Sequence, residues 1–218
     1  KSEALFRALG RFVHSLGGRF LTGNDAGTKK EDFIAVRMET PHVGGLPEAW
    51  GGGGDTAEIT AFGVWQGMRA AAFHVWGQDS LKGRRVALQG LGKVGLRLLR
   101  YLAEEGAEVT VTDIAPDRVA EACRQFPSIR SVSPDEIYDV SCDIFAPCAL
   151  GGVLNDETIA RLRCRVVAGS ANNQLQAPEH GRALYRRGIL YAPDYVINAG
   201  GLIQVVEGER RGRYFYPT

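Results

Sequence analysis

Residues 85–95 read RVALQGLGKVG, and this stretch decides the fold class. Its first part, Arg85 to Gln89, is a short apolar run bounded by a charged residue and a glycine, which is typical of a buried strand. Its second part fits the pattern GxGxxG and leads into residues 94–105, whose apolar side chains recur at helical spacing. A strand, a glycine-rich turn and a helix in this order predict the start of a dinucleotide-binding unit.

The rest of the chain after residue 105 continues this alternation. It predicts parallel strands joined by right-handed crossovers, and therefore an α/β fold with a doubly wound sheet of the Rossmann type. The expected strands are 108–112, 144–145, 165–168 and 189–191, and the expected helices are 117–125, 155–163 and 178–187.

The glycines of the turn have separate expected roles. Gly90 permits the tight turn, Gly92 lets the backbone approach a pyrophosphate, and Gly95 lets the helix pack against the strand. The second strand ends at Asp113, 23 residues after Gly90 (113 − 90). Its carboxylate is expected to accept hydrogen bonds from a ribose and to repel a 2′-phosphate, which predicts NAD as the cofactor. Two alternatives stay open: Arg118 meets a 2′-phosphate, or the motif is only a glycine-rich turn of another α/β protein.

The chain before residue 81 is organised differently. Residues 2–16 have the apolar stripe of an amphipathic helix, and residues 59–76 predict a long helix. Between them we expect a short strand at 19–22 and a polar loop at 23–32. Residues 42–58 contain six glycines between Gly44 and Gly54, so they predict an irregular hinge between two units.

Composition limits the class of protein and of ligand. Of 218 residues, 44% are hydrophobic and 23% are charged, which excludes a disordered or collagenous chain. A net charge of +1 gives no reason to expect nucleic acid or a membrane as a partner. The four cysteines and four histidines lack metal-site spacing, so we expect reduced thiols, no metal and a cytoplasmic location. The ligand is expected to be small.

Five motifs resemble one family, the amino-acid dehydrogenases of the leucine, valine and phenylalanine type within the glutamate dehydrogenase superfamily. In chain order they are VALQGLGKVG, EEGAEVTVTDI, CDIFAPCALGGVLNDETI, VVAGSANNQL and YAPDYVINAGGLIQV. The earlier segments FRALGRFVHSLGGRFLTGNDAGT and TAFGVWQGMRAA are similar to the same family. The resemblance runs over residues 1–206, and leucine dehydrogenases look most similar.

The resemblance implies two domains with an amino acid bound between them. Residues 1–50 would be the C-terminal part of an α/β substrate domain, and residues 51–218 the NAD-binding domain. The family pattern includes two substrate-domain lysines, one of them in a GGGK motif, and none of the chain's five lysines has that context. The chain begins with Lys1, so we expect a piece of a longer polypeptide that binds NADH without turnover. The alternative is a non-catalytic NAD-binding paralogue.

The resemblance also assigns the reaction and the reacting residues. It implies oxidative deamination of an L-amino acid, branched-chain with leucine favoured, by a homo-oligomer of six or eight subunits. Asp25 falls on the catalytic aspartate, although an Asx-turn or helix cap is the other interpretation. Leu202 and Val205 would shape the substrate side-chain pocket, or belong to a core. An aromatic substrate is the alternative.

The expected cofactor contacts come from the glycine turn and from polar residues in three other segments. Thr60 would hold the nicotinamide carboxamide, and Asn172 and Asn198 would line the nicotinamide end. Cys148 is expected to contribute backbone and not to act as a nucleophile. The full set is Thr60, Gly90, Leu91, Gly92, Lys93, Val94, Gly95, Asp113, Ile114, Cys148, Ala149, Asn172 and Asn198.

Overall fold

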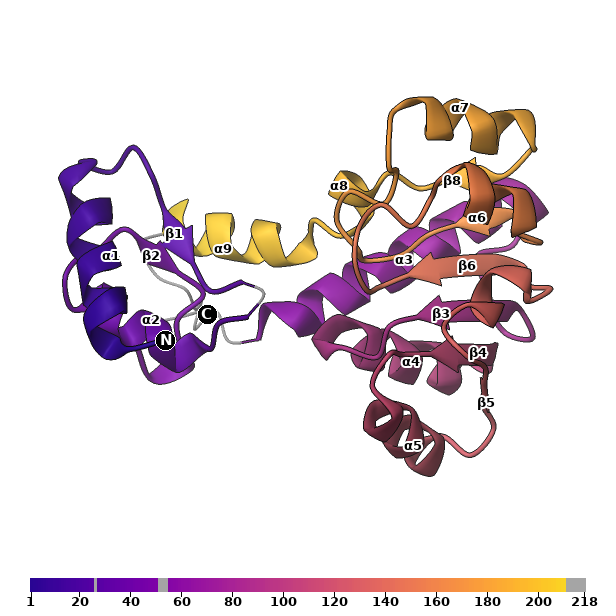
Figure 1. The fold of residues 1–218 in the computed structure, drawn as a ribbon, viewed down its shortest axis with the longest axis horizontal. Helices are drawn as coiled ribbons and strands as arrows, with labels where there is room; N and C mark the ends of the chain where they lie inside the picture. The colour runs from indigo at the N-terminus through magenta and orange to yellow at the C-terminus, as the bar shows by residue number, and fades with distance from the viewer. Residues whose placement is uncertain (26, 51–54, 211–218) are drawn as a thin grey trace. The chain divides into compact units, whose positions relative to one another are not determined.

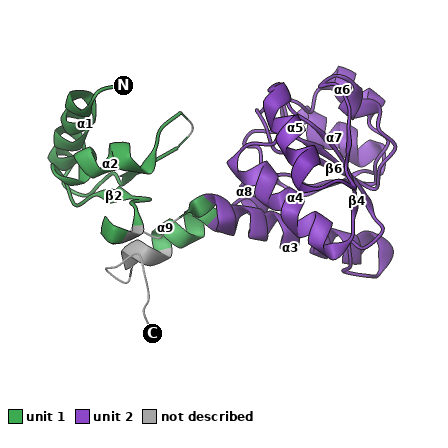
Figure 2. Ribbon diagram, turned by 90° about the horizontal axis from the view of Figure 1, so that it is seen from below, with its two compact units in different colours: residues 1–56, 201–218 green, residues 57–200 purple. Residues whose placement is uncertain are grey.

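The computed structural model describes residues 1–25, 27–50 and 55–210, and these form two compact units (Figure 2). One unit is residues 57–200, and the other is residues 1–56 together with the chain from Gly201 onward. We predicted a single boundary after residue 50, whereas the chain passes between the units near Thr56 and again at Gly200. Glycines 51–54 of the predicted hinge lie outside the described residues.

The larger unit is built on a parallel sheet of six strands (Figure 1). The strand order is β5-β4-β3-β6-β7-β8, so the chain starts in the middle with β3 and winds outward in both directions. This arrangement confirms the predicted doubly wound α/β sheet. The strands are β3 (Arg85–Gln89), β4 (Glu108–Thr112), β5 (Arg130–Ser131), β6 (Ile144–Pro147), β7 (Val166–Val167) and β8 (Leu190–Tyr191).

Helices cover both faces of this sheet, because the buried strands are apolar on both sides. Val86 and Leu88 face a core shared with α3 and α4, whereas Ala87 and Phe145 face a second core with α6 and α7. The helices are α3 (Thr56–Trp76), α4 (Lys93–Glu105), α5 (Pro116–Gln125), α6 (Asp156–Arg161), α7 (Glu179–Arg186) and α8 (Asp194–Ile197), with a 3-10 helix at η2 (Glu136–Asp139).

Local signals fix most of these boundaries. Helix α4 ends at Gly106, whose φ of +83° is the left-handed conformation that terminates helices. Helix α6 begins at Asn155, whose side chain accepts from the backbone N–H of Thr158. Helix α3 starts three residues earlier than predicted, which places Thr60 in its second turn. Strand β5 was not predicted, because its two exposed residues at the sheet edge carry no apolar pattern.

The smaller unit packs two helices on a two-stranded parallel sheet. Its core contains Phe6, Phe33, Val36, Val43 and Leu46. The rings of Phe6 and Phe33 join the helices, with centroids 5.9 Å apart. The elements are α1 (Glu3–Ser15), β1 (Thr22–Gly23), α2 (Lys30–Arg37), β2 (Val43–Gly44) and η1 (Glu48–Trp50), followed at the end of the chain by α9 (Gly200–Arg210).

Three predictions for the smaller unit were wrong in detail. The strand expected at 19–22 is limited to Thr22–Gly23, because its partner β2 begins only two residues after Pro41, which has no N–H to donate. The loop expected at 23–32 already contains the start of α2. The stretch 42–58, expected to be irregular, holds β2, η1 and the first residues of α3. On α1, Phe6 and Val13 are buried but Leu5 and Phe12 are exposed.

Among the described residues, no helix has both the length and the apolar character needed to cross a bilayer.

Candidate active site

The glycine turn after β3 is shaped by close backbone contacts. Gly90 has a φ of +100°, and a Cβ there would lie 2.9 Å from the backbone nitrogen of Ala149. At Gly95 a Cβ would overlap the carbonyl oxygen of Gly90. Gly92 differs from both, because a Cβ there would meet no atom within 4 Å. A side chain would therefore collide with the protein at Gly90 and Gly95 but would find free space at Gly92, which is the N-cap of α4.

Asp113 at the end of β4 holds this turn. Its Oδ2 accepts from the backbone N–H of Leu91 at 2.7 Å, and its Oδ1 accepts from the N–H of Ala115 at 2.8 Å. The side chain is only 5% exposed, and Arg118 Nη1 lies 3.7 Å from Oδ2. Each carboxylate oxygen has a second lone pair, so these bonds leave acceptor capacity for a ribose. Ile114 beside it is exposed.

The loop after β6 lies against the glycine turn. The backbone N–H of Cys148 donates to the carbonyl of Gln89 at 2.7 Å, which extends the pairing of β3 and β6 to the turn. Burial raises the pKa of the Cys148 thiol, whose Sγ accepts from the N–H of Ser170 at 3.4 Å. Burial disfavours a thiolate nucleophile here and outweighs the bond from Ser170, which acts in the opposite direction.

Asn172 and Asn198, far apart in the sequence, are hydrogen-bonded to each other. Asn198 Nδ2 donates to Asn172 Oδ1 at 2.6 Å and to the carbonyl of Ser170 at 3.1 Å. Asn172 is in the loop after β7, whereas Asn198 follows α8. The two predicted residues thus meet beyond the carboxyl end of β7, through a pairing that the sequence alone did not reveal.

Thr60 is brought close to the same place by tight helix packing. A Cβ on Gly200 would overlap the carbonyl of Ile59 and lie 3.2 Å from the Cα of Thr60. Further along α3, a Cβ on Gly67 would lie 2.5 Å from the side chain of Ile197. Small residues at these contacts let α3 approach the segment that carries Asn198, since a side chain would hold the backbones apart.

Gln174 is a residue of this region that the sequence interpretation missed. Its side chain is completely buried, and its Nε2 donates to the carbonyls of Gly169 and Ala171, at 2.8 and 2.9 Å. The one feature of the sequence that pointed to Gln174 was its position in SANNQL, directly after the two asparagines. Hydrogen bonds from a side chain to the backbone leave no periodicity in a sequence, so the role itself was not predictable.

Three predicted residues belong to the other unit. Asp25 is exposed and its carbonyl accepts from the N–H of Thr28 at 3.0 Å, in a turn that precedes α2. The N-cap of α2 is Lys29, so the helix-cap interpretation of Asp25 is wrong. On α9, Leu202 is 67% exposed and Val205 is half-buried.

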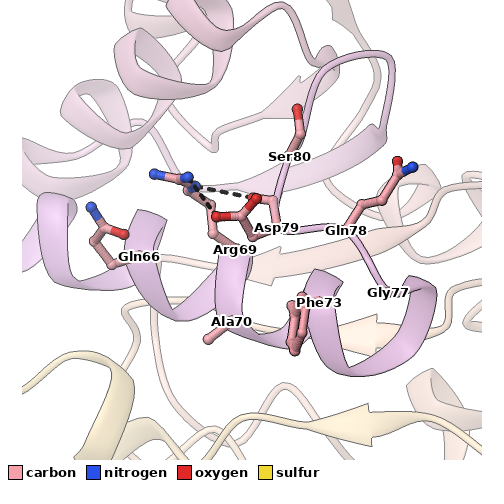
Figure 3. Close-up of a pocket in the computed structure, with 8 residues that line it drawn as sticks. All are labelled: Gln66, Arg69, Ala70, Phe73, Gly77, Gln78, Asp79 and Ser80. Atoms are coloured by element: carbon pink, nitrogen blue, oxygen red, sulfur yellow. Dashed lines mark hydrogen bonds and ion pairs between the residues drawn. The ribbon is translucent and has the colours of Figure 1, made fainter.

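A hollow of about 650 Å³ lies elsewhere, between the second half of α3 and the segment that follows it (Figure 3). It contains an ion pair between Arg69 and Asp79 at 2.8 Å and an exposed Phe73. None of the predicted site residues contributes to it. No cluster of three His, Cys, Asp or Glu side chains suited to a metal is found in the described parts of the chain. The lining residues are Gln66, Arg69, Ala70, Phe73, Gly77, Gln78, Asp79 and Ser80.

Comparison with known families settles the relationship of this chain. The sequence pattern of the Glutamate/Leucine/Phenylalanine/Valine dehydrogenase family matches residues 51–116 and 114–206, which is most of the sequence. The chain belongs to this dehydrogenase family. The resemblance that the five motifs carry is thereby confirmed, and the family members are amino-acid dehydrogenases.

Individual members of the dehydrogenase family are similar at about half of all positions. Leucine dehydrogenase of Thermoactinomyces intermedius is 53% identical over 95% of this chain and 56% of its own length. Phenylalanine dehydrogenase of Caldalkalibacillus thermarum is also 53% identical, over 94% of this chain and 56% of its own length. The solved structure of L-tryptophan dehydrogenase from Nostoc punctiforme matches with a TM-score of 0.80 at 45% identity, over 98% of this chain and 60% of that one. The chain thus spans somewhat more than half of these relatives.

Proposed function

We propose that the whole protein catalyses reversible oxidative deamination with NAD: an L-amino acid, NAD and water give a 2-oxo acid, ammonium and NADH. The observation that carries this proposal is the meeting of the glycine turn, the Cys148 loop and the Asn172–Asn198 pair at one edge of the sheet, in a member of this family. It is the carboxyl edge, where open α/β sheets bind their ligands.

The residues at this edge fit a dinucleotide. Gly92 leaves open space at the start of α4, where the first backbone N–H groups have no partner within the helix and favour an anion. Asp113 retains lone pairs for ribose hydroxyls, and its negative charge opposes a 2′-phosphate, which favours NAD over NADP. Thr60, Asn172 and Asn198 would position the nicotinamide. When bound, NAD supplies the acceptor for the hydride that leaves the substrate Cα.

The substrate is proposed to be a branched-chain amino acid, with leucine favoured. Leu202 and Val205 are aliphatic and would surround its side chain, and Asp25 would exchange protons with its amino group. An aromatic substrate is the second candidate, because relatives named for leucine and for phenylalanine are equally similar to this chain. A cytoplasmic homo-oligomer of six or eight subunits completes the proposal.

Two measurements test the proposal. The first is NADH binding, followed by quenching of the tryptophans. The second is NADH absorbance in the whole protein with NAD or NADP and each of Leu, Val, Phe, Trp and Glu. We expect binding of NADH, and the highest kcat/KM with leucine and NAD. Absence of NADH binding by folded protein would exclude the function, whereas a higher kcat/KM for Phe or Trp would favour the aromatic candidate.

A further inference from the structure

The backbone that leads into Asn172 is fastened by one buried side chain, that of Gln174. Its Nε2 bonds the carbonyls of Gly169 and Ala171 at 2.8 and 2.9 Å, and these residues flank Ser170. A completely buried amide is unusual for glutamine, which is mostly exposed in proteins. The side chain therefore fixes the loop at two points immediately before the asparagine.

Chemistry fixes the orientation of this amide. Carbonyl oxygens only accept hydrogen bonds, so the NH₂ end of Gln174 must face both of them. With the amide reversed, its oxygen would face two other oxygens. A thioether of the same length would fill the space but donate nothing, and the two carbonyls would lose their partner.

A second bond connects Gln174 to the segment that carries Asn198. Its backbone N–H donates to Oδ2 of Asp194 at 3.3 Å, and Asp194 is the first residue of α8. Asn198 is the C-cap of this short helix. The two asparagines are therefore linked twice, directly through their amides and indirectly through Gln174 and Asp194.

The loop also contains one residue in the left-handed backbone conformation. Asn173 has a φ of +51°, and it is the one residue other than glycine with a positive φ in the described segments of the chain. Asparagine adopts this conformation more readily than most residues, so Asn173 suits the turn that leads into Gln174. At Gly169 a Cβ would overlap the backbone of Pro147, so the loop is also pressed against the end of β6.

We infer that Gln174 is a positioning residue for the nicotinamide end of the coenzyme. It holds the loop 169–173 so that Asn172 and Asn198 present their amides in a single arrangement, and it does so without touching the coenzyme. This inference rests on the proposed function, which supplies NAD as the ligand. The adenosine and pyrophosphate end is held by other elements, the turn at 90–95 and Asp113, so a loosened loop affects only one end of the dinucleotide.

The experiment compares two ligands, NADH and ADP-ribose, which has the same adenosine, pyrophosphate and second ribose but no nicotinamide. Their dissociation constants are measured by calorimetry for wild type and for Gln174→Met. We expect Kd for NADH to rise about tenfold, as for the loss of one to two hydrogen bonds, and Kd for ADP-ribose to change by less than about twofold. Leu162→Ala is the control for general destabilisation, because Leu162 is buried but precedes β7, whereas the loop 169–173 follows it. This variant should change neither Kd by more than about twofold.

Asp194→Ala provides a milder second variant, expected to raise Kd for NADH about threefold and to leave ADP-ribose unchanged. It decides the question if Gln174→Met does not fold. Equal weakening of both ligands, or no weakening of NADH, would overturn the inference. So would a wild type that binds both ligands equally well, since the nicotinamide end would then add nothing. A folded wild type that binds neither ligand would instead refute the proposed function.

Discussion

The amide of Asn198 donates to the amide oxygen of Asn172 over 2.6 Å, and the same nitrogen donates to the carbonyl of Ser170. Because both donors of Asn198 are used in this way, its orientation is fixed, and Asn172 must accept through Oδ1. The amide groups of the pair that these bonds do not use are the NH₂ of Asn172, a donor, and the oxygen of Asn198, an acceptor. A donor and an acceptor are the two kinds of group that could bond the primary carboxamide of the proposed nicotinamide.

This pairing predicts different effects for the same substitution at the two positions. Asn198→Asp removes both donors, so the free energy of unfolding should fall by about 1–3 kcal/mol. Asn172→Asp keeps the acceptor, so stability should change by less than about 0.5 kcal/mol while Kd for NADH rises. Urea unfolding and NADH titration measure the two effects. Equal loss of stability in both variants would contradict the direction of the hydrogen bond from Asn198 to Asn172.

Asp113→Ala is expected to act on both the turn and the cofactor. Loss of the acceptor for Leu91 and Ala115 should lower the free energy of unfolding by about 1–3 kcal/mol. Loss of the negative charge should narrow the ratio of NADP to NAD dissociation constants, because a 2′-phosphate is no longer repelled. Calorimetry with both cofactors gives this ratio.

Asp117→Ala removes an equal charge from the first turn of α5, where the side chain is exposed, and serves as the control. It should leave both the stability and the cofactor ratio close to those of wild type. If Asp113→Ala leaves the ratio of NADP to NAD dissociation constants unchanged, Asp113 stabilises the turn but does not select the cofactor.

Much of the larger unit was predictable because its signals are local. The apolar runs at 85–89 and 108–112 coincide with β3 and β4, and Pro116 and Gly106 bound helices close to the expected positions. In the smaller unit the helix predicted at 2–16 corresponds to α1, because its apolar stripe is a local signal, whereas the two strands have only two residues each. Two-residue strands like β1 depend on their partner and have no periodicity of their own.

The candidate site divides in the same way. The glycine turn and Asp113 form a motif with fixed spacing, so the sequence places them together. The contact between Asn172 and Asn198 depends on the order of β6, β7 and β8 in the sheet, which a single sequence does not specify. The role of Gln174 was not predictable, because the sequence does not show whether the side chain of a single glutamine is buried or exposed.

Asp25→Asn tests the proposed proton transfer in the whole protein. We expect kcat to fall by about 10²- to 10⁴-fold while Kd for NADH stays near that of wild type, because a carboxamide cannot accept and return the proton. Steady-state kinetics and NADH titration provide the two values. Glu31→Gln, an exposed acid in the first turn of α2, is the matched control and should retain its kcat. If Asp25→Asn retains a nearly normal kcat, Asp25 does not transfer the proton and serves only to form the turn before α2.

Cys148 is expected to react slowly with iodoacetamide. Burial raises the pKa of its thiol, so at pH near 8 a smaller fraction is thiolate than for an ordinary cysteine, and the rate should keep rising as the pH increases. Cys123 on α5, for comparison, should be alkylated at least about tenfold faster at the same pH. Peptide mass spectrometry of timed samples measures both rates. Equal rates would mean that Cys148 is accessible and activated.

The last prediction concerns Gly92 and Gly95, where the same added methyl group should have opposite consequences. In Gly92→Ala the methyl points into open space and the backbone, with φ −72° and ψ −165°, suits alanine, so stability should fall by less than about 1 kcal/mol. Kd for NADH should nevertheless rise about tenfold or more, since that space is where the pyrophosphate is expected.

In Gly95→Ala the methyl would overlap the carbonyl oxygen of Gly90, which is backbone and cannot turn away as a side chain would. The free energy of unfolding should therefore fall by about 2–4 kcal/mol, and NADH binding should weaken because the turn itself is displaced. Urea unfolding and NADH titration of both variants separate the two cases. A Gly92→Ala protein that is stable and binds NADH normally would show that the pyrophosphate does not approach this turn, and the cofactor site would have to be placed elsewhere.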